Sequence, residues 1–316
     1  MSASLRSKRR RQRLTVLAFL APWLIGMLIF FVYPLLMTLY YSFTRFDLVT
    51  PPRWIGLTNY EFFISKDPKV WQSIRNTLWL VAILVPARML FGLGVSMILT
   101  TVKRGGGLFR TLFYLPALAP PVASTLAFVF MFNPDTGPVN VGLKALGING
   151  PLWFNDPAWA KPALVLLGLW GIGDLMIIFL ASLLDVPRDQ YEAASLDGAN
   201  SWQRFRFVTF PNITPVLTFG AVTGVIAAFQ YFTEATVAAT VASGKANVGE
   251  GIGSTIGYPD GSTLTFPQWL YVKGVSDYAL GYASALAVVL FAASVIFTVI
   301  LLRRAKAFTP AEESLR

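Results

Sequence analysis

Long apolar runs alternate with short polar segments along the whole chain. A helix needs roughly 20 consecutive apolar residues to cross the hydrocarbon core of a bilayer. The pattern predicts such helices over residues 14–41, 77–100, 111–132, 162–184, 213–233 and 280–302. We therefore predict an all-α integral membrane protein with six transmembrane helices.

The polar segments set the predicted domain organisation. From the N-terminus we expect a basic cytoplasmic tail (1–13), a first transmembrane helix (14–41) and an external segment (42–76). A five-helix core (77–302) and a second cytoplasmic tail (303–316) follow. Within the core, residues 185–211 form a cytoplasmic loop and residues 239–278 an external one. The first apolar run is far longer than the roughly 7–15 residues of a signal-peptide core, so we expect it to remain uncleaved.

The distribution of basic residues predicts the orientation. The tails and loops placed inside carry 16 Lys and Arg, whereas those placed outside carry 9, five of them in the first external segment. Because cytoplasmic loops of membrane proteins are enriched in basic residues, both termini and segment 185–211 are expected in the cytoplasm.

Composition excludes several classes of function. The chain is 55% hydrophobic and only 13% charged, against about 25% charged residues in a typical soluble domain. Its net charge of +10 comes from short clusters beside apolar runs, which fits membrane topology rather than binding to nucleic acid. The absence of Cys and His excludes thiol and imidazole catalysis in this chain, and no phosphate-binding loop is present. We expect no catalytic, cofactor-binding or metal-binding residues.

The polar segment 185–211 carries a helical pattern between two apolar runs. Pro187 suits the first position of a helix, and Gly198 suits its end, where a left-handed residue is needed. Ser201 is expected to cap a second short helix without a full capping box, since Arg204 follows three residues later. The segment therefore predicts a helix–glycine–helix hairpin that lies against the membrane.

This segment resembles the EAA loop of binding-protein-dependent ABC importer permeases. The matching residues are Glu192-Ala193-Ala194, Gly198, Val208 and Phe210-Pro211, and Asp197-Gly198-Ala199 is similar to the sugar-permease variant. Val208 and Phe210 stand where the family more often has Ile and Leu. The Gly-Leu-Thr-Asn-Tyr piece at 56–60 and residues 281–291 also resemble sugar permeases.

The resemblance implies the six-helix, MetI-like permease of a type I ABC importer in a bacterial or archaeal plasma membrane. Its partners would be a second homologous permease, two copies of a cytoplasmic ATPase that binds ATP and Mg²⁺, and an external solute-binding protein. The cargo would be a sugar, moved by alternating access. The residues that would dock into the ATPase are Glu192, Ala193, Ala194, Asp197, Gly198 and Arg204.

Two charged residues fall in the middle of predicted spans. Arg88 and Asp174 would each cost about 2.5–3.5 kcal/mol at a helix centre on insertion scales, so they should face a polar interior. Two interpretations stay open: one or both line a substrate path, or they pair with each other or with backbone to hold the bundle. Trp170, Gln230, Tyr231 and Glu234 are further candidates, since aromatic faces stack on sugar rings and polar groups bond sugar hydroxyls. Packing within the bundle is the alternative role for these four residues.

Glycines in the spans suggest close helix packing. We expect this role for Gly92, Gly94, Gly220 and Gly224.

Other functions are compatible with parts of the pattern. An ion-coupled secondary transporter or channel would use Arg88 and Asp174 but does not need the cytoplasmic hairpin. A membrane-embedded enzyme would need a deep carboxylate pair or Ser/Lys site, which these two residues do not make. A permease of the same architecture could instead carry glycerol phosphate, phosphate or a polyamine.

Overall fold

The computed structural model describes residues 2–245 and 252–306. It is mostly helical, as predicted. The chain divides into two compact units, formed by residues 1–66 with 273–289 and by residues 67–272 with 290–316. The last helix, α15 (Leu280–Lys306), contributes to both units.

The first unit begins with one long helix, which is apolar from Thr15 to Tyr41. It consists of α1 (Ser2–Met27), a π-helical turn η1 (Leu28–Val32) and α2 (Tyr33–Tyr41). The wide turn comes just before Pro34, whose ring and missing N–H disturb the preceding turn of a helix. A two-stranded antiparallel ribbon of β1 (Thr44–Arg45) and β2 (Arg53–Trp54) follows, then α3 (Thr58–Ser65). The Asn59 amide ties these parts together by donating to the carbonyls of Ser42 and Thr44, both at 2.9 Å.

The second unit is built around α4 (Val70–Thr101). This helix packs against α8, α9, α12 and α14, whose bounds are given below. The other elements follow in chain order: α5 (Gly106–Tyr114), η2 (Leu115–Leu118), α6 (Pro121–Met131), α7 (Pro138–Ala145), η3 (Trp153–Asn155), α8 (Ala160–Trp170), α9 (Gly173–Asp185), α10 (Arg188–Leu196), α11 (Ser201–Arg204), η4 (Phe205–Thr209), α12 (Phe210–Phe229), α13 (Thr233–Ala242), η5 (Ile252–Ser254), α14 (Phe266–Tyr271) and η6 (Val272–Ser276).

Helix α4 begins at Val70, earlier than the predicted Thr77. Its first two turns include polar residues that bond to a distant segment. The Asn76 amide donates to the carbonyls of Gly261 and Leu264, and the Thr77 hydroxyl accepts the Phe266 N–H at 2.8 Å. Polar residues that suggested an external loop therefore extend the helix and anchor residues 261–266 to it.

Four helices of the described chain are long and apolar enough to cross a membrane: Thr15–Tyr41, Val70–Thr101, Ser201–Phe229 and Leu280–Arg304. Two further apolar segments are broken helix pairs, so that up to six spans are present. Gly106–Leu118 and Pro121–Met131 meet at 99°, and Ala160–Trp170 and Gly173–Asp185 meet at 50°. The first break lies at the cluster Pro116, Pro120 and Pro121, whose rings and missing N–H groups interrupt a helix.

The predicted external loop 239–278 is only partly a loop in the described residues. It contains the end of α13, the short helices η5 and α14, and the turn η6. Residues 246–251 of that loop and residues 307–316 of the predicted C-terminal tail lie outside the described part of the chain.

Candidate functional site

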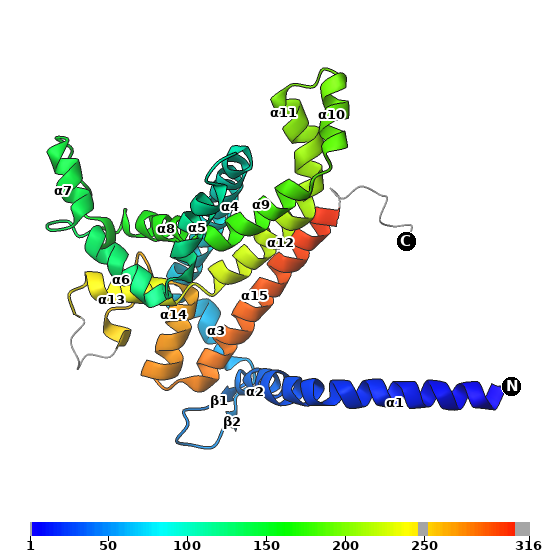
Figure 1. Ribbon diagram of the computed structural model, residues 1–316. Helices are drawn as coiled ribbons and strands as arrows, with labels where there is room; N and C mark the ends of the chain where they lie inside the picture. The colour runs from blue at the N-terminus through cyan, green and yellow to red at the C-terminus, as the bar shows by residue number, and fades with distance from the viewer. Residues whose placement is uncertain (1, 246–251, 307–316) are drawn as a thin grey trace. The chain divides into compact units, whose positions relative to one another are not determined.

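The hairpin predicted at residues 185–211 is present. Helix α10 ends before Gly198, whose φ of +79° is the left-handed conformation expected there. Helix α10 begins at Arg188, so Pro187 precedes the helix instead of occupying its first turn. In Figure 1, α10 and α11 stand at the end of α9 and α12 that is remote from α13 and α14.

The cap of the second hairpin helix is Asn200, not Ser201 as predicted. The Asn200 side chain accepts the Gln203 N–H at 2.9 Å, and the Gln203 side chain accepts the Asn200 N–H at 2.8 Å. This pair forms a full capping box, which the prediction missed because it counted from Ser201. Helix α11 then continues through the π-helical turn η4 into α12, just before Pro211.

Two side-chain hydrogen bonds connect helix α10 to the turn η4 and to the first turn of α12. The hydroxyls of Tyr191 and Thr209 are 2.8 Å apart, and the Asn212 amide donates to the Gln190 side chain at 2.7 Å. No signal in the sequence singles out these residues. Side-chain hydrogen bonds as well as the connecting backbone therefore link α10 to η4 and α12.

Most of the predicted docking residues lie on the surface of the hairpin. Glu192, Ala193, Asp197 and Gly198 are exposed, whereas Ala194 is half-buried. Arg204 instead joins the two hairpin helices, since its guanidinium donates to the Ser195 and Ser201 hydroxyls at 3.3 and 3.4 Å. The same surface carries two large apolar side chains, Leu196 at 90% exposure and Trp202 at 68%.

A cavity of about 370 Å³ lies where the two broken spans approach α4 and α12. Irregular backbone inside a membrane is tolerated where it lines a cavity or is covered by protein. Pro116, Ala119 and Pro121 come from the first break, and Trp170 and Gly171 from the second. Five of the six predicted substrate residues belong to the lining: Arg88, Trp170, Gln230, Tyr231 and Glu234.

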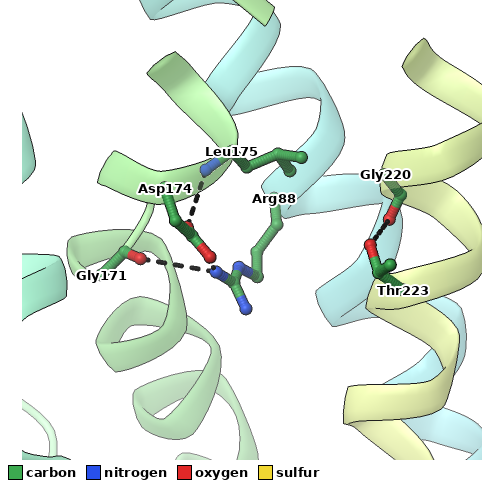
Figure 2. Close-up of polar contacts among 6 residues, drawn as sticks. All are labelled: Arg88, Gly171, Asp174, Leu175, Gly220 and Thr223. Atoms are coloured by element: carbon green, nitrogen blue, oxygen red, sulfur yellow. Dashed lines mark hydrogen bonds and ion pairs between the residues drawn. The ribbon is translucent and has the colours of Figure 1, made fainter. Parts of the chain in front are cut away.

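The sixth candidate, Asp174, lies beside the cavity as the partner of Arg88. One Arg88 terminal nitrogen is 3.3 Å from the Asp174 carboxylate and 3.4 Å from the Gly171 carbonyl (Figure 2). The Asp174 carboxylate also accepts the Leu175 N–H at 2.7 Å. The two interpretations of this pair are thus compatible for Arg88, which both pairs with Asp174 and lines the cavity.

Glycines bring the helices around the cavity close together. A methyl group on Gly92, Gly220 or Gly224 would stand within 3.3 Å of a side chain of a neighbouring helix. A methyl group added to Gly94 would meet no described atom of this chain within 4 Å. The expected role in packing between helices of this chain is therefore wrong for Gly94. Gly173 is a further close contact that the sequence pattern does not indicate, since its added methyl group would stand 2.5 Å from the Phe113 carbonyl oxygen.

Comparison with known proteins identifies the family. The family model described as "Binding-protein-dependent transport system inner membrane component" matches residues 89–307. The chain belongs to this family. It is therefore a multi-pass membrane permease component of the ABC transport systems that the family serves.

Several relatives are similar along nearly the whole chain. A probable ABC transporter permease protein, YesP of Bacillus subtilis, is 38% identical over 93% of this chain and 91% of its own length. The sulfoquinovosyl glycerol permease SmoG of Agrobacterium fabrum is 33% identical over 92% of this chain and 90% of its own. The lactose permease LacF of Rhizobium radiobacter is 35% identical over 80% of each chain.

A solved structure shares the fold. A chain in the crystal structure of a bacterial ABC transporter involved in the import of the acidic polysaccharide alginate superimposes with a TM-score of 0.77. The match covers 97% of this chain and 100% of the other, at 21% identity. This likeness supports the MetI-like, mostly helical architecture.

Proposed function

We propose that this chain is the permease subunit of an ATP-driven importer that moves a mono- or oligosaccharide into the cytoplasm by alternating access. Its partners are a second homologous permease in a heterodimer, two copies of a cytoplasmic ATPase and an external solute-binding protein. Both termini and the hairpin α10–α11 lie in the cytoplasm of a bacterial or archaeal cell. ATP and Mg²⁺ bind to the partner ATPase, and this chain supplies the path through the membrane.

The cavity at the two broken spans carries the proposal. A sugar offers apolar ring faces and many hydroxyl groups, so its site needs a flat aromatic surface together with donors and acceptors. Trp170 supplies such a surface, Gln230 offers both kinds of group, and Glu234 offers acceptors. Relatives named for lactose and sulfoquinovosyl glycerol transport support a sugar as cargo.

The hairpin supports coupling to a separate ATPase. Its outer face presents Glu192 beside the small residue Ala193, which allows another backbone to come close, and the apolar Leu196 and Trp202 offer contact area. For ATP to shift the conformational equilibrium, the ATPase must contact the hairpin differently in the two states. The bonds of Tyr191 and Gln190 to residues of η4 and α12 provide a route from that contact to α12.

Copurification followed by an ATPase assay tests this function. The chain carrying an affinity tag is extracted from its native membrane in mild detergent, and the proteins bound to it are identified. The proposal predicts an ABC ATPase and a second permease, with ATP hydrolysis that a sugar and its binding protein stimulate. Stimulation by glycerol phosphate or a polyamine alone would replace the sugar as cargo. Ion-driven uptake by the chain without an ATPase would establish a secondary transporter instead.

A further inference from the structure

Arg88 connects three parts of the second unit at one point. It belongs to α4 and lines the cavity, while one of its terminal nitrogens lies near the Gly171 carbonyl and the Asp174 carboxylate (Figure 2). Gly171 ends α8, and Asp174 lies in the first turn of α9. The two acceptors therefore stand on either side of the break at which this span bends by 50°. A single side chain cross-links both sides of the bend.

The geometry of this cross-link favours replacement of the two acceptors of Arg88. Hydrogen bonds between an arginine and a carboxylate are typically about 2.7–2.9 Å long, whereas the contact of Arg88 with Asp174 measures 3.3 Å. Its bond to the uncharged Gly171 carbonyl is also long, at 3.4 Å. Asp174 keeps 63% of its side chain exposed within this chain, so Arg88 does not enclose its carboxylate. The Asp174 oxygen that Arg88 approaches also retains the Leu175 N–H at 2.7 Å.

Two buried hydrogen-bonding groups of residues that line the cavity have no partner among the described residues. The Arg88 Nε–H is buried and has no partner among the described residues, and the same holds for the Tyr231 hydroxyl, on a side chain with only 8% exposure. Both residues line the cavity, where a bound molecule with several oxygen atoms can satisfy them. Buried donors without partners are unfavourable, which gives a reason for such a molecule to bind there.

We propose that the cargo controls the α8–α9 bend by competing for Arg88. Oxygen atoms of the sugar accept hydrogen bonds from the guanidinium and the Tyr231 hydroxyl, and they replace Gly171 and Asp174 as the acceptors of Arg88. The break then loses its cross-link to α4, so that occupancy of the cavity changes the bend. Arg88 is thus a specificity-determining residue, and Asp174 is its competitor. This inference rests on the proposed function, since it needs a cargo rich in oxygen acceptors.

Opposite effects of two substitutions test the competition. The complex is reconstituted in lipid nanodiscs, and ATPase stimulation is titrated with lactose, arabinobiose and digalacturonate in the presence of the binding protein. R88Q should raise the half-maximal concentration of the active sugar at least tenfold, the loss expected for a hydrogen bond to a charged group. D174N should lower it, because Arg88 loses its competing acceptor. R88K, which keeps the charge but not the planar fork, should fall between wild type and R88Q.

The bend itself is measured by electron spin resonance. The chain contains no cysteine, so spin labels at A158C and L184C report the distance across the two exposed ends of the α8–α9 span. The labelled protein that keeps Arg88 should change its distance distribution when sugar binds. The labelled R88Q variant should show that sugar-bound distribution even without sugar. The charge swap R88D/D174R should restore the sugar-free distribution but not the response to sugar, because the cavity has lost its guanidinium.

The outcomes separate the two proposals. If no sugar stimulates the wild-type complex, the proposed cargo is wrong and the competition proposal is wrong with it. If a sugar does stimulate it, but R88Q and D174N shift the half-maximal concentration in the same direction, the pair only holds the bundle together. An identical label distance with and without sugar also overturns control of the bend.

Discussion

Gly173 lies directly against the backbone of Phe113, so that the first turn of α9 touches the end of α5. A methyl group added to Gly173 would stand 2.5 Å from the Phe113 carbonyl oxygen and 2.7 Å from the Tyr114 Cα. Backbone atoms cannot move away as the end of a flexible side chain can. The two broken spans that line the cavity can therefore pack this closely only because Gly173 has no side chain.

Replacement of Gly173 by alanine should destabilise the permease. Overpacking typically costs about 1–3 kcal/mol, and contact with backbone places this site at the upper end. We expect G173A to lower the midpoint of thermal unfolding of the detergent-solubilised complex and the yield of assembled complex. Gly171, two residues earlier, has open space around it and provides the control. An unchanged midpoint for G173A, or an equal loss for G171A, would show that this close approach is not required.

Single cysteines should report the orientation of the chain in intact cells. The native sequence has no cysteine, Leu196 is 90% exposed on the hairpin, and Val49 is 88% exposed in the segment predicted outside. A membrane-impermeant maleimide should label V49C in intact cells, and L196C only after the membrane is opened. Labelling of L196C from outside would place the hairpin on the wrong side for a cytoplasmic ATPase.

Removal of the Tyr191 hydroxyl should weaken coupling between hydrolysis and transport. Y191F loses the 2.8 Å contact with Thr209 that braces α10, while the docking surface around Glu192 is unchanged. A hydrogen bond of this kind contributes about 0.5–1.5 kcal/mol. We expect ATPase activity close to wild type and several-fold less sugar transported per ATP hydrolysed. The matched control Y33F alters a tyrosine exposed in the first span. Equal ratios of transport to hydrolysis in Y191F and wild type would rule out this brace as a coupling element.

Trp170 should contribute to sugar affinity through its ring face. Aromatic contacts are worth about 0.5–1.5 kcal/mol beyond burial, so W170A should raise the half-saturating sugar concentration for uptake by roughly two- to thirteenfold. W170F, which keeps a smaller flat ring, should lose less. Trp159 packs on Trp153 outside the cavity lining, and W159F serves as the control for loss of an indole. An unchanged half-saturating concentration in W170A would assign Trp170 to packing against Phe128, its neighbour at a ring distance of 5.4 Å.

Much of this architecture could be predicted from the sequence, because its strongest signals are local. Apolar length predicts spans, and Gly198 ends a helix through its own backbone freedom. The break around Pro116 and Pro121 follows from proline chemistry. Arg88 and Asp174 could be selected because charge is costly within a membrane span, but that cost alone does not identify a partner.

The remaining features depend on contacts between distant parts of the chain. Asn76 extends α4 into an apparently external segment because its acceptors lie near residue 261. The need for Gly173 depends on the backbone of Phe113, which belongs to a different span. Nothing in the local sequence distinguishes Gly173 from Gly94, which has open space. Only the folded arrangement reveals that Arg88 both lines the cavity and holds the α8–α9 break.

The central claim is that ATP hydrolysis by a partner drives a sugar through this chain by way of the hairpin. Its most direct test is uptake of a radiolabelled sugar by proteoliposomes that contain the purified complex, with the binding protein on one side and ATP on the other. The account predicts uptake that requires ATP, persists when ion gradients are collapsed and is lost in E192K but not in E61K. Uptake that proceeds without ATP, or that survives in E192K at the wild-type rate, would contradict the account.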